Sequence, residues 1–221
     1  MTQRNRKEKQ SSVISARILL WLYGHISSET VRRRLRTWIL AFEGGPALSL
    51  SIRTILKRHH GLDVGLHSVA PCMMVPNVLH SGTIIGRYST LADTVRTFTR
   101  DHPMNTKSSH AVFFNPALGL ATGSGLKAGR LEIGHGVSIG HNAIILATAK
   151  IIGNGAVIAP EAVVYRNVPP YAIVEGNPAQ VVGFRYPKNV IDEILASRWW
   201  EKTASEAGMP AERAAAEARA S

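Results

Sequence analysis

The chain has 221 residues, of which 45% are hydrophobic and 19% are charged, and its net charge is +11 at neutral pH. This length and composition are typical of one globular subunit, and the polar start of the chain does not resemble a secretory signal. The single cysteine, Cys72, excludes an intrachain disulfide and a thiolate metal cluster. We therefore expect a cytoplasmic protein.

The positive charge is concentrated in residues 1–60, which hold twelve Lys or Arg and three Glu, a balance of +9. Apolar residues recur there at helical spacing, with basic residues between them. The pattern of residues 13–23 predicts an apolar helix. It is too short to span a bilayer, which needs roughly twenty residues. The later apolar positions are Val31, Leu35, Trp38, Ile39 and Phe42, then Leu48, Ile52, Ile55 and Leu56; the basic ones are Arg32, Arg33, Arg34, Arg36, Arg53, Lys57 and Arg58. Gly44 and Gly45 are predicted to end the first of these two helices.

The middle of the chain repeats with a period of six residues. Each repeat opens with an aliphatic residue, usually followed by a small one, and has another small or branched residue at its fifth place. The repeats begin at Ile85, Leu91, Ile133, Ile139, Ile145, Ile152, Ile158 and Val164. One extra residue, Ile151, resets the phase.

A six-residue unit suits one short strand and a turn, so the chain can wind into a prism of parallel strands with the first-place residues stacked inside. Ordinary sheet strands alternate with a period of two and would not keep aliphatic residues in step at six. We therefore predict an all-β solenoid, a parallel β-helix, over residues 61–186.

Two segments depart from this repeat. Residues 97–130, approximately, form an inserted loop that carries Asp101-His102-Pro103-Met104-Asn105. Glu175-Gly176-Asn177-Pro178-Ala179 closes the repeats. After Pro187, residues 190–200 have the pattern of a C-terminal helix, and the composition from Thr203 onward predicts a frayed or disordered tail, so that residues 187–221 form a third region.

These motifs together resemble the hexapeptide-repeat acyltransferases over most of residues 62–200, and they look most similar to the branch of xenobiotic and sugar O-acetyltransferases. The resemblance implies a left-handed β-helix that assembles as a homotrimer. It also implies acetyl transfer from acetyl-CoA to a hydroxyl, without a covalent enzyme intermediate and without a metal.

The resemblance implies that His102 is the catalytic general base. An imidazole has an ordinary pKa of about 6.5 and can take the proton of a hydroxyl as that hydroxyl attacks a thioester. Asn105 and His110, in the same loop, are the candidate residues for the acceptor.

The family pattern also assigns acetyl-CoA to the outside of the β-helix, between subunits. The corresponding positions here are His141, Ala143, Ala159, Pro160, Tyr165, Arg166 and Gln180. Arg166 stands where lysine is common and keeps a cation for a phosphate oxygen. Ser138 replaces a tryptophan of many relatives, and Tyr165 replaces a smaller residue.

We therefore predict an O-acetyltransferase whose acceptor is a sugar, a polysaccharide precursor or a related small molecule, with an antibiotic or a serine-like molecule as the next choice. A non-catalytic β-helix scaffold or binding module is the alternative. A zinc-dependent carbonic anhydrase on the same fold is disfavoured, because the spacing of His135 and His141 departs from that family by one residue.

Residues 1–60 have two interpretations. We favour a helical cap, because solenoid ends must be covered and the apolar stripes need a surface to pack against. The other interpretation is attraction to an anionic surface, including peripheral contact with a membrane. Nucleic acid is not an expected partner, because no recognition motif accompanies the charge.

Overall fold

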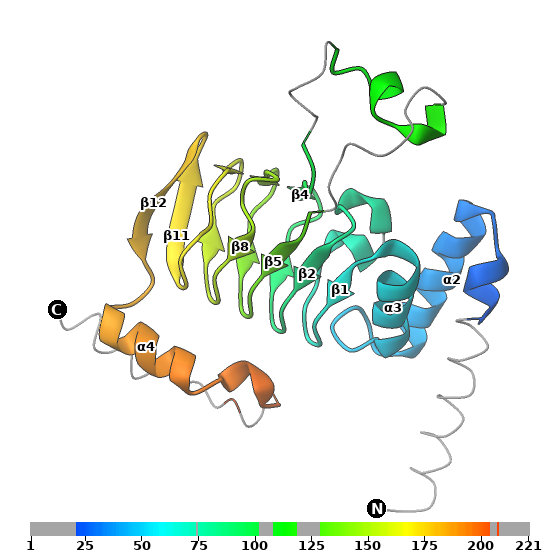
Figure 1. Ribbon diagram of the computed structural model, residues 1–221. Helices are drawn as coiled ribbons and strands as arrows, with labels where there is room; N and C mark the ends of the chain where they lie inside the picture. Colours follow the sequence, from blue (N-terminus) through cyan, green and yellow to red (C-terminus); the bar gives the residue numbers. More distant parts are fainter. Residues whose placement is uncertain (1–20, 74, 102–107, 119–128, 204–206, 208–221) are drawn as a thin grey trace, which may run out of the picture.

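The computed structural model describes residues 21–73, 75–101, 108–118, 129–203 and 207, and it shows three sheets wound around one apolar interior (Figure 1). The strand orders are β1-β2-β5-β8, β10-β7-β4 and β12-β11-β9-β6-β3. The strands are β1 Asp63–Val64, β2 Thr83–Ile85, β3 Thr90–Leu91, β4 Arg96–Thr97, β5 Leu131–Ile133, β6 Ser138–Ile139, β7 Ile144–Ile145, β8 Ile151–Ile152, β9 Val157–Ile158, β10 Val163–Val164, β11 Ala172–Gly176 and β12 Ala179–Phe184.

The chain visits the three sheets in turn, so β5, β6 and β7 form one coil and β8, β9 and β10 form the next. Strands of successive coils pair in parallel, as β4, β7 and β10 do through Thr97, Ile145 and Val164. Only the final pair, β11 with β12, is antiparallel among the described strands. The predicted arrangement of parallel strands is confirmed.

The interior is built from the first place of the repeat, as predicted, and also from the fifth place. The buried pairs are Ile133 and Val137, Ile139 and Ala143, Ile145 and Ala149, Ile152 and Ala156, Ile158 and Ala162, and Val164 and Val168. Side chains at these two places turn inward because each short strand contributes one inward position and the following corner contributes the other.

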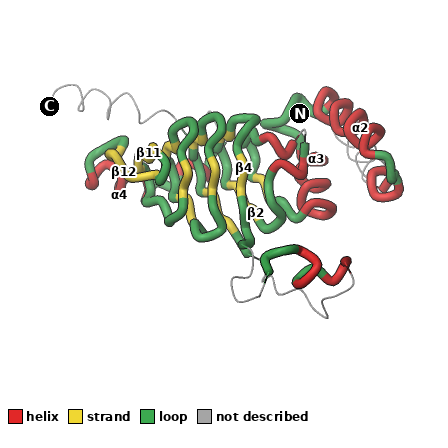
Figure 2. The backbone as a smooth tube through the Cα atoms, turned by 90° about the horizontal axis from the view of Figure 1, so that it is seen from above, coloured by secondary structure: helices red, strands yellow, loops and turns green. Residues whose placement is uncertain are grey.

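The N-terminal helices cover the end of the coil next to β1 (Figures 1 and 2). They comprise α2 Glu29–Phe42, α3 Leu50–Ile55 and a turn of π-helix at Leu56–His60. Leu35, Ile39, Ile52, Ile55 and Leu56 join the core of the coil. Of the predicted helix at residues 13–23, only residues 21–23 are described; they lie in a helical stretch that runs to residue 25.

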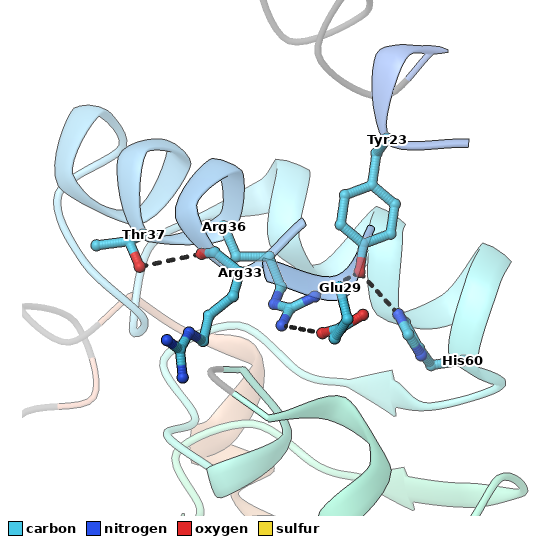
Figure 3. Close-up of polar contacts among 6 residues, drawn as sticks. All are labelled: Tyr23, Glu29, Arg33, Arg36, Thr37 and His60. Atoms are coloured by element: carbon cyan, nitrogen blue, oxygen red, sulfur yellow. Dashed lines mark hydrogen bonds and ion pairs between the residues drawn. The ribbon is translucent and has the colours of Figure 1, made fainter. Parts of the chain in front are cut away.

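The sequence pattern suggested that the arginines of these helices face water, but two of them are buried. Arg36 is 1% exposed; it donates to the Tyr23 hydroxyl at 2.6 Å and pairs with Glu29 at 2.7 Å (Figure 3). The Tyr23 hydroxyl also lies 2.9 Å from His60 Nε2. Arg53 is buried as well, and its guanidinium donates to backbone carbonyls, among them that of Ser49 at 2.6 Å.

Three residues predicted to pack inward lie outside instead: Val31, Trp38 and Phe42 of α2 are 46%, 65% and 87% exposed. Leu48, before α3, is 50% exposed. The helix thus buries the side that carries Leu35, Arg36, Ile39 and Leu40. The helical spacing did not show that this side would be covered and that the side with Val31, Trp38 and Phe42 would stay exposed.

The C-terminal helix, α4, spans Lys188–Ala196 and is shorter than the predicted helix over residues 190–200. Arg198 has a left-handed backbone with φ of 44°, which ends the helix, and a turn of 3-10 helix follows at Trp199–Glu201. No helix among the described residues is long and apolar enough to cross a bilayer.

Candidate active site

The inserted loop leaves the coil after β4, which ends at Thr97, and returns at β5, which begins at Leu131. Its described residues 108–118 stand away from the coil in both views and contain short 3-10 helices at Ala111–Phe113 and Pro116–Leu118 (Figures 1 and 2). His102 and Asn105 lie outside the described residues.

His110, the second predicted acceptor residue, is exposed and caps the first 3-10 turn. Its Nδ1 accepts from the Val112 N–H at 3.3 Å, and its own N–H donates to Ser108 Oγ at 3.2 Å. Phe113 is 55% exposed, whereas Phe114 is buried. The imidazole of His110 therefore holds the local turn through Nδ1.

Six of the seven predicted cofactor residues lie at the two ends of the strands of one sheet, β10-β7-β4, whereas the seventh, Gln180, belongs to β12 of another sheet. His141 and Pro160 lie in the corners that lead into this sheet, after β6 and β9, whereas Tyr165 and Arg166 follow β10 in the corner that leads out of it. The strand that sends out the inserted loop, β4, belongs to the same sheet.

Three of the predicted residues meet at the outgoing corner. Gln180 Nε2 lies 3.2 Å from the Tyr165 hydroxyl, and the Arg166 guanidinium lies 5.0 Å from the centre of the Tyr165 ring. Thr148 Oγ1 donates to the Tyr165 carbonyl at 2.7 Å and steadies this corner. An exposed guanidinium beside an aromatic face can bind a phosphate oxygen and a flat ring system.

Two predicted residues have little to offer through their side chains. Ala143 is wholly buried at the fifth place of its repeat, and its carbonyl accepts from the Arg96 N–H at 3.1 Å. The Ala159 N–H donates to the Val174 carbonyl at 2.8 Å. Ser138, at the position where the resemblance implied tryptophan, is exposed, so a small polar residue lies on the surface here.

The two corner histidines have separate roles. His141 is exposed and its Nδ1 lies 3.3 Å from Thr94 Oγ1. His135 stacks on Trp200, with ring centres 4.9 Å apart and planes at 4°, and its Nδ1 accepts from the Arg87 N–H at 2.8 Å. Within the described residues there is no group of three His, Cys, Asp or Glu that could hold a metal ion.

Sequence reasoning missed His80, Thr83 and Thr97 at the foot of the inserted loop. Leu79-His80-Ser81-Gly82-Thr83-Ile84 is itself a repeat, with Leu79 3% exposed and Thr83 wholly buried. The signal that could have found it is the leucine six residues before Ile85.

No family model matches the chain. It is 35% identical over 123 residues to a chloramphenicol acetyltransferase from Klebsiella aerogenes, which covers 53% of this chain and 58% of that protein. It is 43% identical over 88 residues to a chloramphenicol acetyltransferase from Agrobacterium fabrum, covering 40% and 38%. The chain is a hexapeptide-repeat protein related to acetyltransferases.

The resemblance predicted from the repeats and motifs is confirmed by these relatives. This hexapeptide-repeat protein spans about half the length of the curated relatives it matches. A hexapeptide-repeat acetyltransferase from Vibrio cholerae, in two solved structures of which one is complexed with acetyl coenzyme A, gives TM-scores of 0.43 and 0.40 at 16% and 17% identity. The alignments cover 81% of this chain and 94% and 90% of the solved chains.

Proposed function

We propose that the protein is an acetyl-CoA-dependent O-acetyltransferase that acts on a hydroxyl of a sugar, a polysaccharide precursor or a related small molecule. The observation that carries the proposal is the sheet β10-β7-β4, which has six of the seven predicted cofactor residues at the ends of its strands and the root of the histidine-bearing loop on its strand β4. The sequence relation to acetyltransferases supports it.

The reaction requires one base. His102 takes the proton of the acceptor hydroxyl while the oxygen attacks the thioester carbonyl carbon. The carbon–sulfur bond then breaks, the imidazolium returns the proton to the departing CoA sulfur, and the products are an acetyl ester and free CoA. Arg166, beside the Tyr165 ring, contributes a cation for a phosphate of the donor.

The assembly that fits this chemistry is a homotrimer of left-handed β-helices, with acetyl-CoA lying between neighbouring subunits. In this assignment residues 1–60 cap the coil, residues 61–186 form the transferase domain and residues 187–221 form the C-terminal region. A cytoplasmic location agrees with the use of acetyl-CoA.

The relatives suggest which acceptors to try first. Their names include chloramphenicol acetyltransferase, a probable macrolide acetyltransferase, virginiamycin A acetyltransferase and a 3-N-acetyltransferase of a dTDP-linked amino sugar. A panel of chloramphenicol, virginiamycin A, a macrolide, a dTDP-sugar and serine covers these chemistries and the predicted acceptor classes.

Calorimetric titration with acetyl-CoA is the first test, because it needs no acceptor. Saturable binding with about one site per chain at roughly micromolar concentration supports the transferase. Absence of binding up to about millimolar acetyl-CoA by folded protein contradicts it and favours the scaffold alternative.

The second test is His102→Ala, assayed by thiol release with the acceptor that turns over fastest. We expect kcat to fall at least about a hundredfold, because the general base is lost, while the acetyl-CoA Kd and the melting temperature stay unchanged. His110→Ala is the comparison within the same loop, with an expected effect on the acceptor KM. Substantial turnover by His102→Ala removes this histidine from the mechanism.

We further propose that the outer face of the N-terminal cap contacts an anionic membrane surface. Its exposed apolar stripe, Val31, Trp38 and Phe42, lies on the same helix as the exposed Arg33 and Arg34. Aromatic and aliphatic side chains beside arginines are the combination that interfacial helices use.

Sedimentation with vesicles of phosphatidylglycerol and phosphatidylcholine tests this contact. Trp38→Ser with Phe42→Ser is expected to lower the bound fraction several-fold, because two interfacial anchors are lost. Leu118→Ser, on the inserted loop and 51% exposed in the native chain, is the control. Equal binding by the cap variant and the control would exclude this surface.

A further inference from the structure

Two columns of inward side chains run along the β-helix. They are aliphatic except in the turn from which the inserted loop leaves. Leu79, Thr97, Ile145 and Val164 stack at the first place, with Thr97 paired to Leu79 on one side and to Ile145 on the other. Thr83 occupies the fifth place in the adjacent column and pairs with Leu131. Both threonines are essentially inaccessible to water, at 1% and 0% exposure.

A hydroxyl in an apolar interior is unfavourable unless it is hydrogen-bonded, and these two hydroxyls are. Thr83 Oγ1 donates to the His80 carbonyl at 2.7 Å and lies 3.2 Å from Thr97 Oγ1. Thr97 Oγ1 accepts from the His80 N–H at 3.1 Å. The pair therefore binds both backbone groups of His80. This histidine lies three residues before Thr83, and one coil before Thr97.

His80 in turn contacts the first residues of the inserted loop. Its Nδ1 accepts from the Thr99 N–H at 3.4 Å, and its ring meets the Phe98 ring edge-on at 5.3 Å between centres. The Thr99 hydroxyl, also buried, donates to the Ser81 carbonyl at 3.0 Å.

The returning end of the loop, at Gly129, packs closely against Thr99. A Cβ atom added to Gly129 would lie 1.7 Å from the Thr99 carbonyl oxygen, so only glycine fits between the two ends of the loop. The loop thus has a closed neck, formed by Thr99 and Gly129.

We propose that Thr83, Thr97 and Thr99 form a threonine clamp that positions the inserted loop for catalysis. The proposal rests on the proposed function, in which the reacting imidazole belongs to His102, three residues beyond Thr99. A shift of about 1 Å in a catalytic base costs on the order of a hundredfold in rate, so a rigid neck has a direct effect on kcat. The threonines are positioning residues and need not touch substrate.

Three variants separate positioning from packing. Thr97→Val keeps the side-chain volume, matches the aliphatic column and removes the hydroxyl. Thr97→Ser keeps the hydroxyl and removes a methyl group. Ser89→Ala is the control, because Ser89 is also wholly buried and its hydroxyl also links two coils, through the Gly134 carbonyl at 2.7 Å, at another corner.

The first readout is amide hydrogen exchange, which requires no acceptor. In Thr97→Val we expect exchange at the His80 and Thr99 amides to rise at least about tenfold, with Thr97→Ser and Ser89→Ala close to wild type at these two amides. Unchanged exchange in Thr97→Val overturns the clamp.

The second readout is acetyl transfer, by thiol release with the acceptor of the panel that turns over fastest. We expect kcat of Thr97→Val to fall at least about tenfold with the acetyl-CoA Kd unchanged, and Thr97→Ser to retain most of the wild-type kcat. Faster exchange with a wild-type kcat overturns the positioning role. Wild-type protein that transfers acetyl to no acceptor of the panel contradicts the proposed function instead, while the exchange result still decides whether the clamp holds the neck.

Discussion

Single residues show how closely the six-residue period controls the environment of a side chain. Ile151 and Ile152 are adjacent in β8, and Ile151 is 48% exposed whereas Ile152 is fully buried. Ile151 is the extra residue that resets the phase of the repeat, and Ile152 opens the next repeat. The sequence placed Ile152 at the first place of a repeat, which was predicted to point inward, and the structure adds that the extra residue points outward.

Truncation of these two isoleucines is a matched test. Ile152→Ala should lower the free energy of unfolding by about 2 to 5 kcal/mol, because it leaves a cavity in the closed interior. Ile151→Ala should cost less than about 1 kcal/mol, because its side chain is half exposed. Urea denaturation of both variants measures the difference, and equal losses would mean that the register of the coil is wrong.

The proposed role of Arg166 in binding the donor depends on its residue type, its position in the repeat and its neighbours in the structure. Its exposed guanidinium lies over the Tyr165 ring, which Gln180 also contacts. The family resemblance implied a cation at this position; the structure adds that Gln180, fifteen residues from Tyr165, reaches the same corner.

Removal of this cation should weaken binding of the donor and nothing else. We expect Arg166→Met to raise the acetyl-CoA Kd about three- to tenfold, since an exposed charge-assisted contact is partly screened by solvent. Lys188→Met, which removes the same charge from α4, is the control. Calorimetric titration of both variants checks the prediction, and an equal Kd for Arg166→Met and wild type would exclude a phosphate contact.

At the scale of elements, the C-terminal segment acts as a strap along one edge of the coil. Trp199 donates to the Tyr171 hydroxyl at 3.2 Å and lies 5.4 Å from the Tyr88 ring, measured between centres, and Trp200 stacks on His135. Tyr88, His135 and Tyr171 come from three different coils, so this short segment ties those coils together.

We expect the strap to make stability depend on pH through His135. Burial, and then the charge of Arg87, lower the pKa of His135 below its ordinary value; Arg198 acts in the same direction and Glu201 opposes it. The folded protein therefore favours the neutral imidazole more than the unfolded chain does, and in the neutral form Nδ1 can accept from the Arg87 N–H. On the unfolded chain the imidazole is half protonated at about pH 6.5, so the contribution of His135 to stability is full well above that pH and is lost as the pH falls through and below it.

We expect the wild-type free energy of unfolding to decrease between about pH 7.5 and about pH 5, and to decrease less in His135→Gln, which cannot be protonated. Some decrease should remain in the variant, because burial also lowers the pKa of His60 and of His67. Urea denaturation at the two pH values provides the comparison. An identical decrease in both proteins would mean that His135 does not contribute to the pH dependence.

The N-terminal helices show which features of an element the sequence does not predict. The pattern identified α2 and α3 but placed all arginines of the first helix on the solvent side, whereas Arg36 is buried against Tyr23 and Glu29 (Figure 3). A buried guanidinium requires partners from other turns and other elements, and local spacing carries no information about them.

At the scale of the whole molecule, the coil leaves apolar surface uncovered on its terminal hairpin. Val181, Val182 and Phe184 of β12 are 45%, 55% and 52% exposed. Such an edge strand in a single subunit is a natural place for contact with another copy of the chain.

The family resemblance implies a homotrimer, and we expect this assembly in solution, with this hairpin in the contact and the donor site completed at the boundary between subunits. Light scattering during size exclusion should give three times the subunit mass of 24.0 kDa. Phe184→Glu should lower this mass and weaken acetyl-CoA binding together, because it places a charge in the contact. A subunit mass for the wild-type protein at micromolar concentration would exclude the trimer.

The sequence by itself determined the period, and with it the parallel coil, its inward residues and the place where the loop interrupts them, because each of these depends on local spacing. Only the tertiary structure decided what contacts cross from one coil to another: the buried Arg36, the strap on His135, the meeting of Tyr165 with Gln180, and the hydroxyls of Thr83 and Thr97 on His80. These contacts join residues from different turns of the winding. Their partners are set by how coils stack, and a six-residue pattern repeats without recording which side chain lies above which.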